Sequence, residues 1–193
     1  MGWTVSESGL LITSVDGVER GDRAVVEVAV GVLIERDTAD REGRFLLTSR
    51  PLGKLYAGHW EFPGGKLEPG ETVGQALARE LHEELGIGVD SGAVQPWQQA
   101  LFDYPHARVR LHFCKVFEWS GEFEMREGQQ MAWAELPVHL SPVLPGTLPV
   151  LRWFAAERGY QGPTHCEPTR QQGAQQGAQQ GAQQGAQQGA HGQ

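Results

Sequence analysis

Residues 61–87 read EFPGGKLEPGETVGQALARELHEELGI, and this stretch decides the fold. Its first ten residues contain three glycines and two prolines, a composition that is typical of a tight loop. Thr72 is a favourable residue for starting a helix, and Gly86 is well placed to end one. We therefore expect a loop followed by a helix over residues 72–85.

The expected helix places carboxylates where a merely solvated acidic face would not. Its apolar stripe, about 120° wide at about 100° per residue, is formed by Val73, Leu77, Leu81 and Leu85. Glu84 falls about 20° inside the stripe, Glu80 about 20° outside its border, and Glu83 about 80° outside it. Like charges at these spacings cost about 0.2–0.5 kcal/mol per pair even when exposed. A divalent cation would remove that cost, and such oxygen ligands suit Mg²⁺, with Mn²⁺ as a second possibility. The alternative is an ordinary charged helix with a salt bridge to Arg79.

The same residues resemble a known family motif. Gly65, Glu71 and the run RELHEELGI at 79–87 match every specified position of the Nudix box, G-x5-E-x7-R-E-U-x-E-E-x-G-U, where U is aliphatic. The preceding WEFPG at 60–64 and the order of elements over about residues 25–157 resemble the MutT-like branch, the bacterial 8-oxo-dGTP diphosphatases. The resemblance implies an α/β fold of the Nudix type, an α/β/α sandwich in which helices flank a mixed β-sheet. It also implies a hydrolase that acts on phosphorus-containing anhydrides.

The resemblance further implies roles for individual residues. The catalytic carboxylates would be Glu80, Glu83, Glu84 and Glu127. The metal ligands would be Glu80, Glu83 and Glu84 with the carbonyl of Gly64, and Glu71 with Arg79 would give structural support. The substrate-binding residues would be Arg50, Glu61, Phe62, Pro63, Gly64 and Thr147. Glu80, Glu83 and Glu127 all remain candidates for the general base. Glu127 as a solvated loop residue and Arg50 as a surface charge at a strand end are the alternatives.

Thr147 bears on which substrate is hydrolysed. MutT-like proteins carry an Asn just before the last helix that reads the modified guanine, whereas the corresponding residue in the run PGTLP at 145–149 is Thr147. A hydroxyl offers a purine edge less reach than an amide does. Thr147 as a helix cap is the other interpretation.

The function implied by the resemblance is Mg²⁺-dependent hydrolysis of 8-oxo-dGTP to 8-oxo-dGMP and pyrophosphate, which sanitises the nucleotide pool and avoids mutation. The alternatives are hydrolysis of ADP-ribose or of a dinucleoside polyphosphate, and a non-catalytic nucleotide-binding module. Tyr104 lies near the position where some diadenosine polyphosphate hydrolases carry a tyrosine. An interaction scaffold based on the C-terminal repeats is a further alternative.

The rest of the domain shows mixed periodicity. Strands are expected over residues 25–35, 45–50, 97–104, 107–119 and 130–135, and a second helix over residues 147–157. Residues 36–44 are interpreted as a hairpin loop, and strand 97–104 as the antiparallel partner of strand 107–119. In the latter strand, one face is expected to carry Val109, Leu111, Phe113, Phe117 and Trp119.

Composition and repeats bound the remaining possibilities. The 24 acidic and 16 basic residues give a net charge of -8, which argues against stable nucleic-acid binding and leaves a nucleotide as the expected partner. Five copies of QQGA at 171–190 have nothing large to bury, so a disordered tail is expected over residues 161–193. Residues 1–23 are interpreted as an N-terminal extension and residues 24–160 as the Nudix domain.

The expected setting follows from what the sequence lacks. We find no pattern typical of a secretory signal, and the longest apolar run is too short to cross a bilayer. Cys114 and Cys166 do not indicate a disulfide framework. We therefore expect a cytoplasmic protein without membrane contact, with a monomer as the favoured state.

Overall fold

The structure, a computed structural model, describes residues 2–5, 11–14, 24–38, 41–103 and 107–166. Its strands are β1 (Gly2–Val5), β2 (Leu11–Ser14), β3 (Val25–Thr38), β4 (Arg41–Ser49), β5 (Trp60–Glu61), β6 (Gly64–Lys66), β7 (Gln95–Asp103), β8 (Arg108–Val116) and β9 (Met131–Ala134). Its helices are α1 (Val73–Leu85) and α2 (Leu148–Glu157), and α2 follows the 3-10 turn η1 (Pro145–Thr147).

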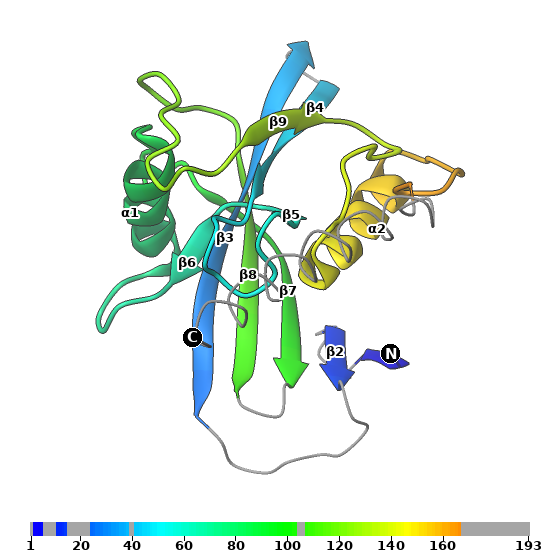
Figure 1. Ribbon diagram of the computed structural model, residues 1–193, viewed down its shortest axis with the longest axis horizontal. Coiled ribbons are helices and arrows are strands. Elements are labelled where there is room, and N and C mark those ends of the chain that lie inside the picture. Colours follow the sequence, from blue (N-terminus) through cyan, green and yellow to red (C-terminus); the bar gives the residue numbers. More distant parts are fainter. Residues whose placement is uncertain (1, 6–10, 15–23, 39–40, 104–106, 167–193) are drawn as a thin grey trace, which may run out of the picture.

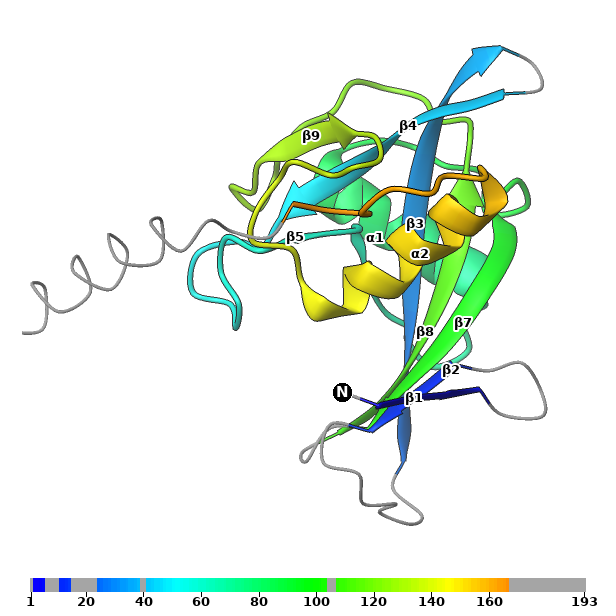
Figure 2. The same ribbon diagram turned by 90° about the vertical axis from the view of Figure 1, so that its right-hand side faces the viewer.

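The sheet is mixed, as the sequence predicts. Its strands follow the order β1-β2-β7-β8-β3-β4-β5, with β6 paired to β3 and β9 paired to β4. β3 runs parallel to β8, and β2 runs parallel to β7. The pair β7–β8 is antiparallel, which confirms the expected partnership of these two strands. The paired β1 and β2 lie beside β7, where the long strands project beyond α2 (Figure 2).

Helices cover both faces of the central strands, so the α/β/α sandwich is confirmed (Figure 1). On one face, Leu77 and Leu81 of α1 pack with Leu33 of β3 in a buried cluster. On the other face, Phe154 of α2 packs in a second cluster that includes Phe113 of β8. Successive side chains of a strand point to opposite faces of the sheet. Neighbouring residues of β3 therefore pack in the two different clusters.

α1 begins and ends where the sequence predicts. The Thr72 hydroxyl accepts a hydrogen bond from the Gln75 N–H at 3.3 Å, and the Gln75 side chain accepts one from the Thr72 N–H at 2.9 Å. This reciprocal pair is a capping box, which satisfies backbone donors that a helix start leaves unpaired. At the other end, Gly86 adopts φ 73°, a left-handed conformation that glycine reaches without strain.

Replacing Thr72 with alanine is expected to lower the free energy of unfolding by about 1 kcal/mol, because the Gln75 N–H loses its acceptor. Thr72→Ser keeps the hydroxyl and should lose much less. Denaturant unfolding of the two variants beside the wild type checks this, and equal losses for Ala and Ser would contradict the capping role.

The hairpin predicted at 36–44 is confirmed, because β3 and β4 pair antiparallel, but the prediction that the whole segment is loop was wrong. β3 continues to Thr38 and β4 begins at Arg41, so most of this segment is paired. The paired ends of β3 and β4, here called the β3–β4 ribbon, are largely exposed and irregular in register. Ion pairs such as Arg44–Glu35 at 2.8 Å link the two strands. Polar cross-strand pairs replace the apolar alternation on which strand prediction depends.

Two further predictions need correction. The strand expected to reach residue 119 ends at Val116, and Trp119 packs with the α1-side cluster rather than with Phe113. The loop expected at 61–70 contains β6, whose backbone pairs with Val28–Val30 of β3. Glycine-rich strands have little side-chain signal, so composition alone suggests a loop.

Backbone pairing continues at both ends of the chain beyond the predicted domain limits. Leu11–Ser14 joins the sheet through β7, although this segment lies in the predicted N-terminal extension. After α2, the Val138 N–H donates to the Thr164 carbonyl and the Cys166 N–H donates to the Val138 carbonyl, both at 2.9 Å. Most of the predicted tail, including the QQGA repeats, lies outside the described residues, as does Tyr104. Neither helix in the described ranges has the length and apolarity that a membrane span needs.

Candidate active site

A cavity of about 290 Å³ brings together most of the site residues that the sequence predicts. Its apolar wall comes from β3 and β8 and includes Val30, Leu111 and Phe113. Predicted site residues that line it are Arg50, Glu61, Phe62, Pro63, Gly64, Glu84, Glu127 and Thr147. Glu80 and Glu83 do not line it, although they come from the same helix as Glu84.

Arg79 organises the carboxylates around the start of α1. Its Nε and Nη2 donate to the two oxygens of Glu71, both at 2.9 Å, and its Nη1 donates to Glu80 at 2.8 Å. These contacts hold the pKa of Glu71 at about 2, mainly through the hydrogen bond from Arg79. Glu83 lies farther away, at 3.6 Å from Arg79, with 59% of its side chain exposed. The supporting pair predicted between Glu71 and Arg79 is therefore formed.

Glu84 is the carboxylate that turns into the cavity. Its Oε2 accepts a hydrogen bond from the Gly64 N–H at 3.2 Å, which joins the C-terminal turn of α1 to β6. The pKa of Glu84 is raised to about 7, chiefly by burial and also by the neighbouring charges of Glu127 and Glu80, against the lowering effect of the hydrogen bond from Gly64. The ionised form of Glu84 is therefore disfavoured at this position unless a cation lies beside it.

Close packing explains why residues 64 and 65, the first two residues of β6, are glycines. A Cβ at Gly64 would collide with the Ala29 carbonyl oxygen, and Gly64 has φ 141°. A Cβ at Gly65 would collide with the carboxyl group of Glu80. At Gly64 only a residue without a side chain lets β6 approach β3, whereas at Gly65 a side chain would require the flexible carboxyl end of Glu80 to move.

Arg50 and Glu61 form a fixed pair at the cavity wall. The Arg50 Nη1 lies 2.7 and 2.8 Å from the two Glu61 oxygens, and its Nε donates to the Leu55 carbonyl at 2.7 Å. Burial is the main influence on Glu61 and raises its pKa, against the lowering effect of Arg50. Arg50 is thus a cavity residue anchored on two elements and not a free charge at a strand end.

Lys54 and Gln129 are cavity residues that the sequence analysis missed. The Lys54 ammonium lies 2.6 Å from Glu127 Oε2. The buried Gln129 amide donates to the Glu84 carbonyl and accepts from the Glu127 N–H, both at 2.9 Å. Gln129 therefore ties the Glu127 loop to the end of α1. Lys54 lies in a loop without periodicity, and the only signal for Gln129 was its position two residues after Glu127.

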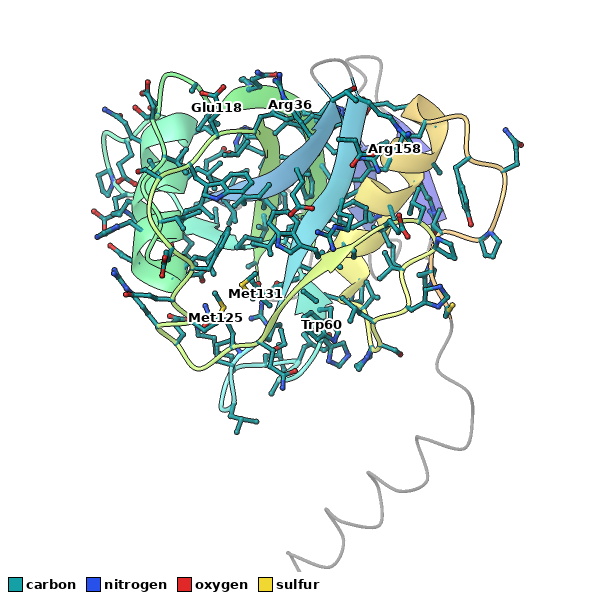
Figure 3. The ribbon with its side chains drawn as sticks, turned by 90° about the horizontal axis from the view of Figure 1, so that it is seen from above. Arg36, Trp60, Glu118, Met125, Met131 and Arg158 are labelled. Carbon is teal, nitrogen blue, oxygen red and sulfur yellow. The ribbon has the colours of Figure 1, made fainter. Side chains whose placement is uncertain are left out.

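Thr147 lines the cavity but does not cap α2. Its hydroxyl is 3.4 Å from the Trp60 carbonyl oxygen, to which it donates, and its side chain makes no capping hydrogen bond. Trp60, labelled in Figure 3, lies on β5 and fixes this contact. Only 2% of Thr147 is exposed. The helix-cap interpretation was therefore wrong, and the single hydroxyl proton is already directed at backbone.

The side chains at this site have the chemistry for a divalent cation, although they are not arranged as a complete cage. Within the described ranges, no three His, Cys, Asp or Glu side chains converge closely enough to hold a metal. Glu80 turns toward Arg79, and Glu127 turns toward Lys54. Carboxylates that repel one another take cationic partners in this way. The raised pKa of Glu84 and the hard oxygen donors around it fit a hard divalent cation.

Comparisons with known proteins identify what this chain is similar to. The NUDIX domain family model matches residues 26–154. The 8-oxo-dGTP diphosphatase of Haemophilus influenzae is 39% identical over 114 residues, which is 59% of this chain and 79% of that protein. The CTP pyrophosphohydrolase of Escherichia coli is 38% identical over 135 residues, 69% of this chain and 94% of that protein.

Structural similarity gives the same result. A solved chain from the analysis of MutT of Aliivibrio salmonicida and Vibrio cholerae superposes with a TM-score of 0.56 at 32% identity, covering 69% of this chain and 99% of its own length. The family match spans β3 to α2, the elements that build the cavity and carry the carboxylates. The chain therefore belongs to the NUDIX domain family.

Proposed function

We propose that this protein is a Mg²⁺-dependent nucleoside triphosphate pyrophosphohydrolase whose leading substrate is 8-oxo-dGTP, with 8-oxo-dGMP and pyrophosphate as products. The observation that carries the proposal is the composition of the cavity. The lining of this one cavity combines an apolar wall with Glu84 and Glu127. The nucleobase and the cation-bound polyphosphate of one nucleotide can therefore bind in the same cavity. The H. influenzae relative, named an 8-oxo-dGTP diphosphatase, supports the choice of substrate.

In this proposal Glu80, Glu83 and Glu84 would hold the cation together with the Gly64 carbonyl. A bound Mg²⁺ supplies charge neutralisation of the phosphates and activation of a water molecule. Glu80, which pairs with Arg79 at 2.8 Å, would exchange this partner for the cation, while the two hydrogen bonds between Arg79 and Glu71 would keep the helix in position. Glu80, Glu83 and Glu127 remain the candidates to accept the proton of the attacking water. Phe62, 5% exposed at the cavity wall, and its apolar neighbours pack against the base.

CTP is a second candidate substrate. The E. coli relative, named a CTP pyrophosphohydrolase, matches over nearly its whole length. The Thr147 hydroxyl lies 3.4 Å from the Trp60 carbonyl oxygen, and a hydroxyl offers a purine edge less reach than an amide does.

The setting is part of the same proposal. We infer a cytoplasmic monomer that binds nucleotides and forms no stable complex with nucleic acid. The two cysteines, Cys114 and Cys166, are both free thiols, which fits a reducing compartment. The negative net charge opposes binding to the phosphate backbone of nucleic acid.

Measuring Mg²⁺-dependent kcat/KM for 8-oxo-dGTP, dGTP, CTP and ADP-ribose tests the substrate assignment. We expect 8-oxo-dGTP to exceed dGTP by about 10-fold or more, a difference of the size that a few hydrogen bonds in a pocket can give. A higher value for CTP would replace the first candidate with the second. Turnover of ADP-ribose alone would overturn both.

A further inference from the structure

Lys54 is placed on a structured turn at the edge of the cavity. The loop between β4 and β5 is closed at its base, because the Gly58 N–H donates to the Arg50 carbonyl at 2.9 Å and the Arg50 N–H donates to the His59 carbonyl at 2.8 Å. Within it, the Ala57 N–H donates to the Lys54 carbonyl at 3.1 Å. These backbone bonds hold the Lys54 main chain and direct its ammonium to the cavity, where it meets Glu127.

The cavity has two cations among the described residues that line it, Arg50 and Lys54. They differ in how firmly they are engaged. Arg50 is bound to both oxygens of Glu61 and to the Leu55 carbonyl, and 26% of its side chain is exposed. Lys54 forms an ion pair with a single oxygen of Glu127, and 48% of its side chain is exposed. An exposed ion pair of this kind contributes little stability, so Lys54 can exchange its partner at small cost.

A nucleoside triphosphate would bring several negative charges to a cavity that already contains Glu61, Glu84 and Glu127. The Lys54 ammonium lines this cavity and is held by an exposed ion pair, so it is suited to contact a phosphate oxygen. We propose that Lys54 is a further substrate-binding residue, whose ammonium leaves Glu127 and contacts a phosphate of the bound nucleotide. This inference rests on the proposed function, since it requires a polyphosphate substrate. It also frees the Glu127 carboxylate when the nucleotide is bound.

Calorimetric binding of the α,β-imido analogue of 8-oxo-dGTP in Mg²⁺ tests the inference without relying on turnover. Lys54→Gln is expected to raise the Kd about 10-fold, the loss of one charge-assisted hydrogen bond. Lys54→Arg keeps the charge and should stay within about 3-fold of the wild type. Arg41→Gln is the matched control, because it removes the same charge from an exposed ion pair with Asp37 in the β3–β4 ribbon, and its Kd should not change.

The Glu127→Gln background separates a phosphate contact from a purely positioning role. If Lys54 contacts phosphate, Lys54→Gln should still weaken binding in this background, by about 5-fold. If Lys54 only holds Glu127, the second substitution should have no further effect, and the inference is wrong. An unchanged Kd for the single variant Lys54→Gln would also overturn it. Failure of the wild type to bind the analogue would instead overturn the proposed function, and this inference with it.

Discussion

Glu84→Gln should lower the Mg²⁺-dependent kcat/KM for 8-oxo-dGTP by about 10³-fold, the scale of losing one group that stabilises charge at a reacting centre. Glu84 is the box carboxylate that lines the cavity, and the Gly64 N–H fixes one of its oxygens. Glutamine keeps the shape of the side chain and an oxygen acceptor for Gly64. The variant therefore removes the charge with little change in packing. Steady-state kinetics across a Mg²⁺ titration gives the result.

Stability provides the companion measurement for the same variant. Glu84 is largely buried beside Glu80 and Glu127, so its ionised form opposes folding when no cation is bound. In EDTA at pH 8, the free energy of unfolding of Glu84→Gln should equal or exceed that of the wild type. Glu122→Gln, on an exposed residue remote from the cavity lining, is the control and should leave kcat/KM unchanged. Near-wild-type turnover by Glu84→Gln would remove this carboxylate from the mechanism.

The helix that carries the carboxylates could be predicted because its signals are local. Thr72 and Gly86 mark its ends through hydrogen bonds and dihedral angles that involve only nearby residues. Leu77 and Leu81 are spaced for one helix face, and both are fully buried as the spacing predicts. The position of Glu84 near that stripe also predicted its partial burial. Helical periodicity thus carried information from sequence to site without any knowledge of the tertiary fold.

The groups that reach the site from other segments could not be predicted in this way. Lys54 and Glu127 are separated by 73 residues, yet their side chains meet at 2.6 Å. Lys54 lies in a turn whose place is set by backbone bonds of Arg50, and nothing in its local sequence indicates a partner. Thr147 shows the same limit, because its contact with the Trp60 carbonyl decides what its hydroxyl can do. Such contacts depend on the sheet that brings β4, β5 and η1 together.

Gly64 and Gly65 are understood only when sequence and structure are combined. The sequence places Gly64 and Gly65 in a loop-like stretch, whereas in the structure they form β6 on the edge of β3. The Pro63 carbonyl also accepts a hydrogen bond from the Gly31 N–H at 2.8 Å, which fixes this stretch against β3. The Gly64 N–H is thereby held in position to donate its hydrogen bond to the Glu84 carboxylate. The requirement for glycine is therefore a requirement of the active-site geometry.

Gly64→Ala is accordingly expected to lower both stability and activity. The new Cβ would collide with the Ala29 carbonyl oxygen, which belongs to a fully buried strand residue, and φ 141° is itself unfavourable for alanine. We expect a loss of about 2–3 kcal/mol in the free energy of unfolding, which combines backbone strain with the displacement of β6. Because the Gly64 N–H and carbonyl would both shift, kcat/KM should fall by about 10²-fold, as for other small misplacements at a reacting centre.

Gly70→Ala separates the collision from the dihedral angle. Gly70 also has positive φ, at 87°, but a Cβ there would have no atom within 4 Å. This control should cost about 1 kcal/mol and leave kcat/KM close to the wild-type value. Chemical denaturation and steady-state kinetics of the two variants give the comparison. If Gly64→Ala and Gly70→Ala lose equal stability and activity, the close approach of β6 to β3 does not set the geometry of Glu84. A larger loss of activity at Gly64 alone ties the 3.2 Å contact between the Gly64 N–H and the Glu84 carboxylate to the rate of hydrolysis.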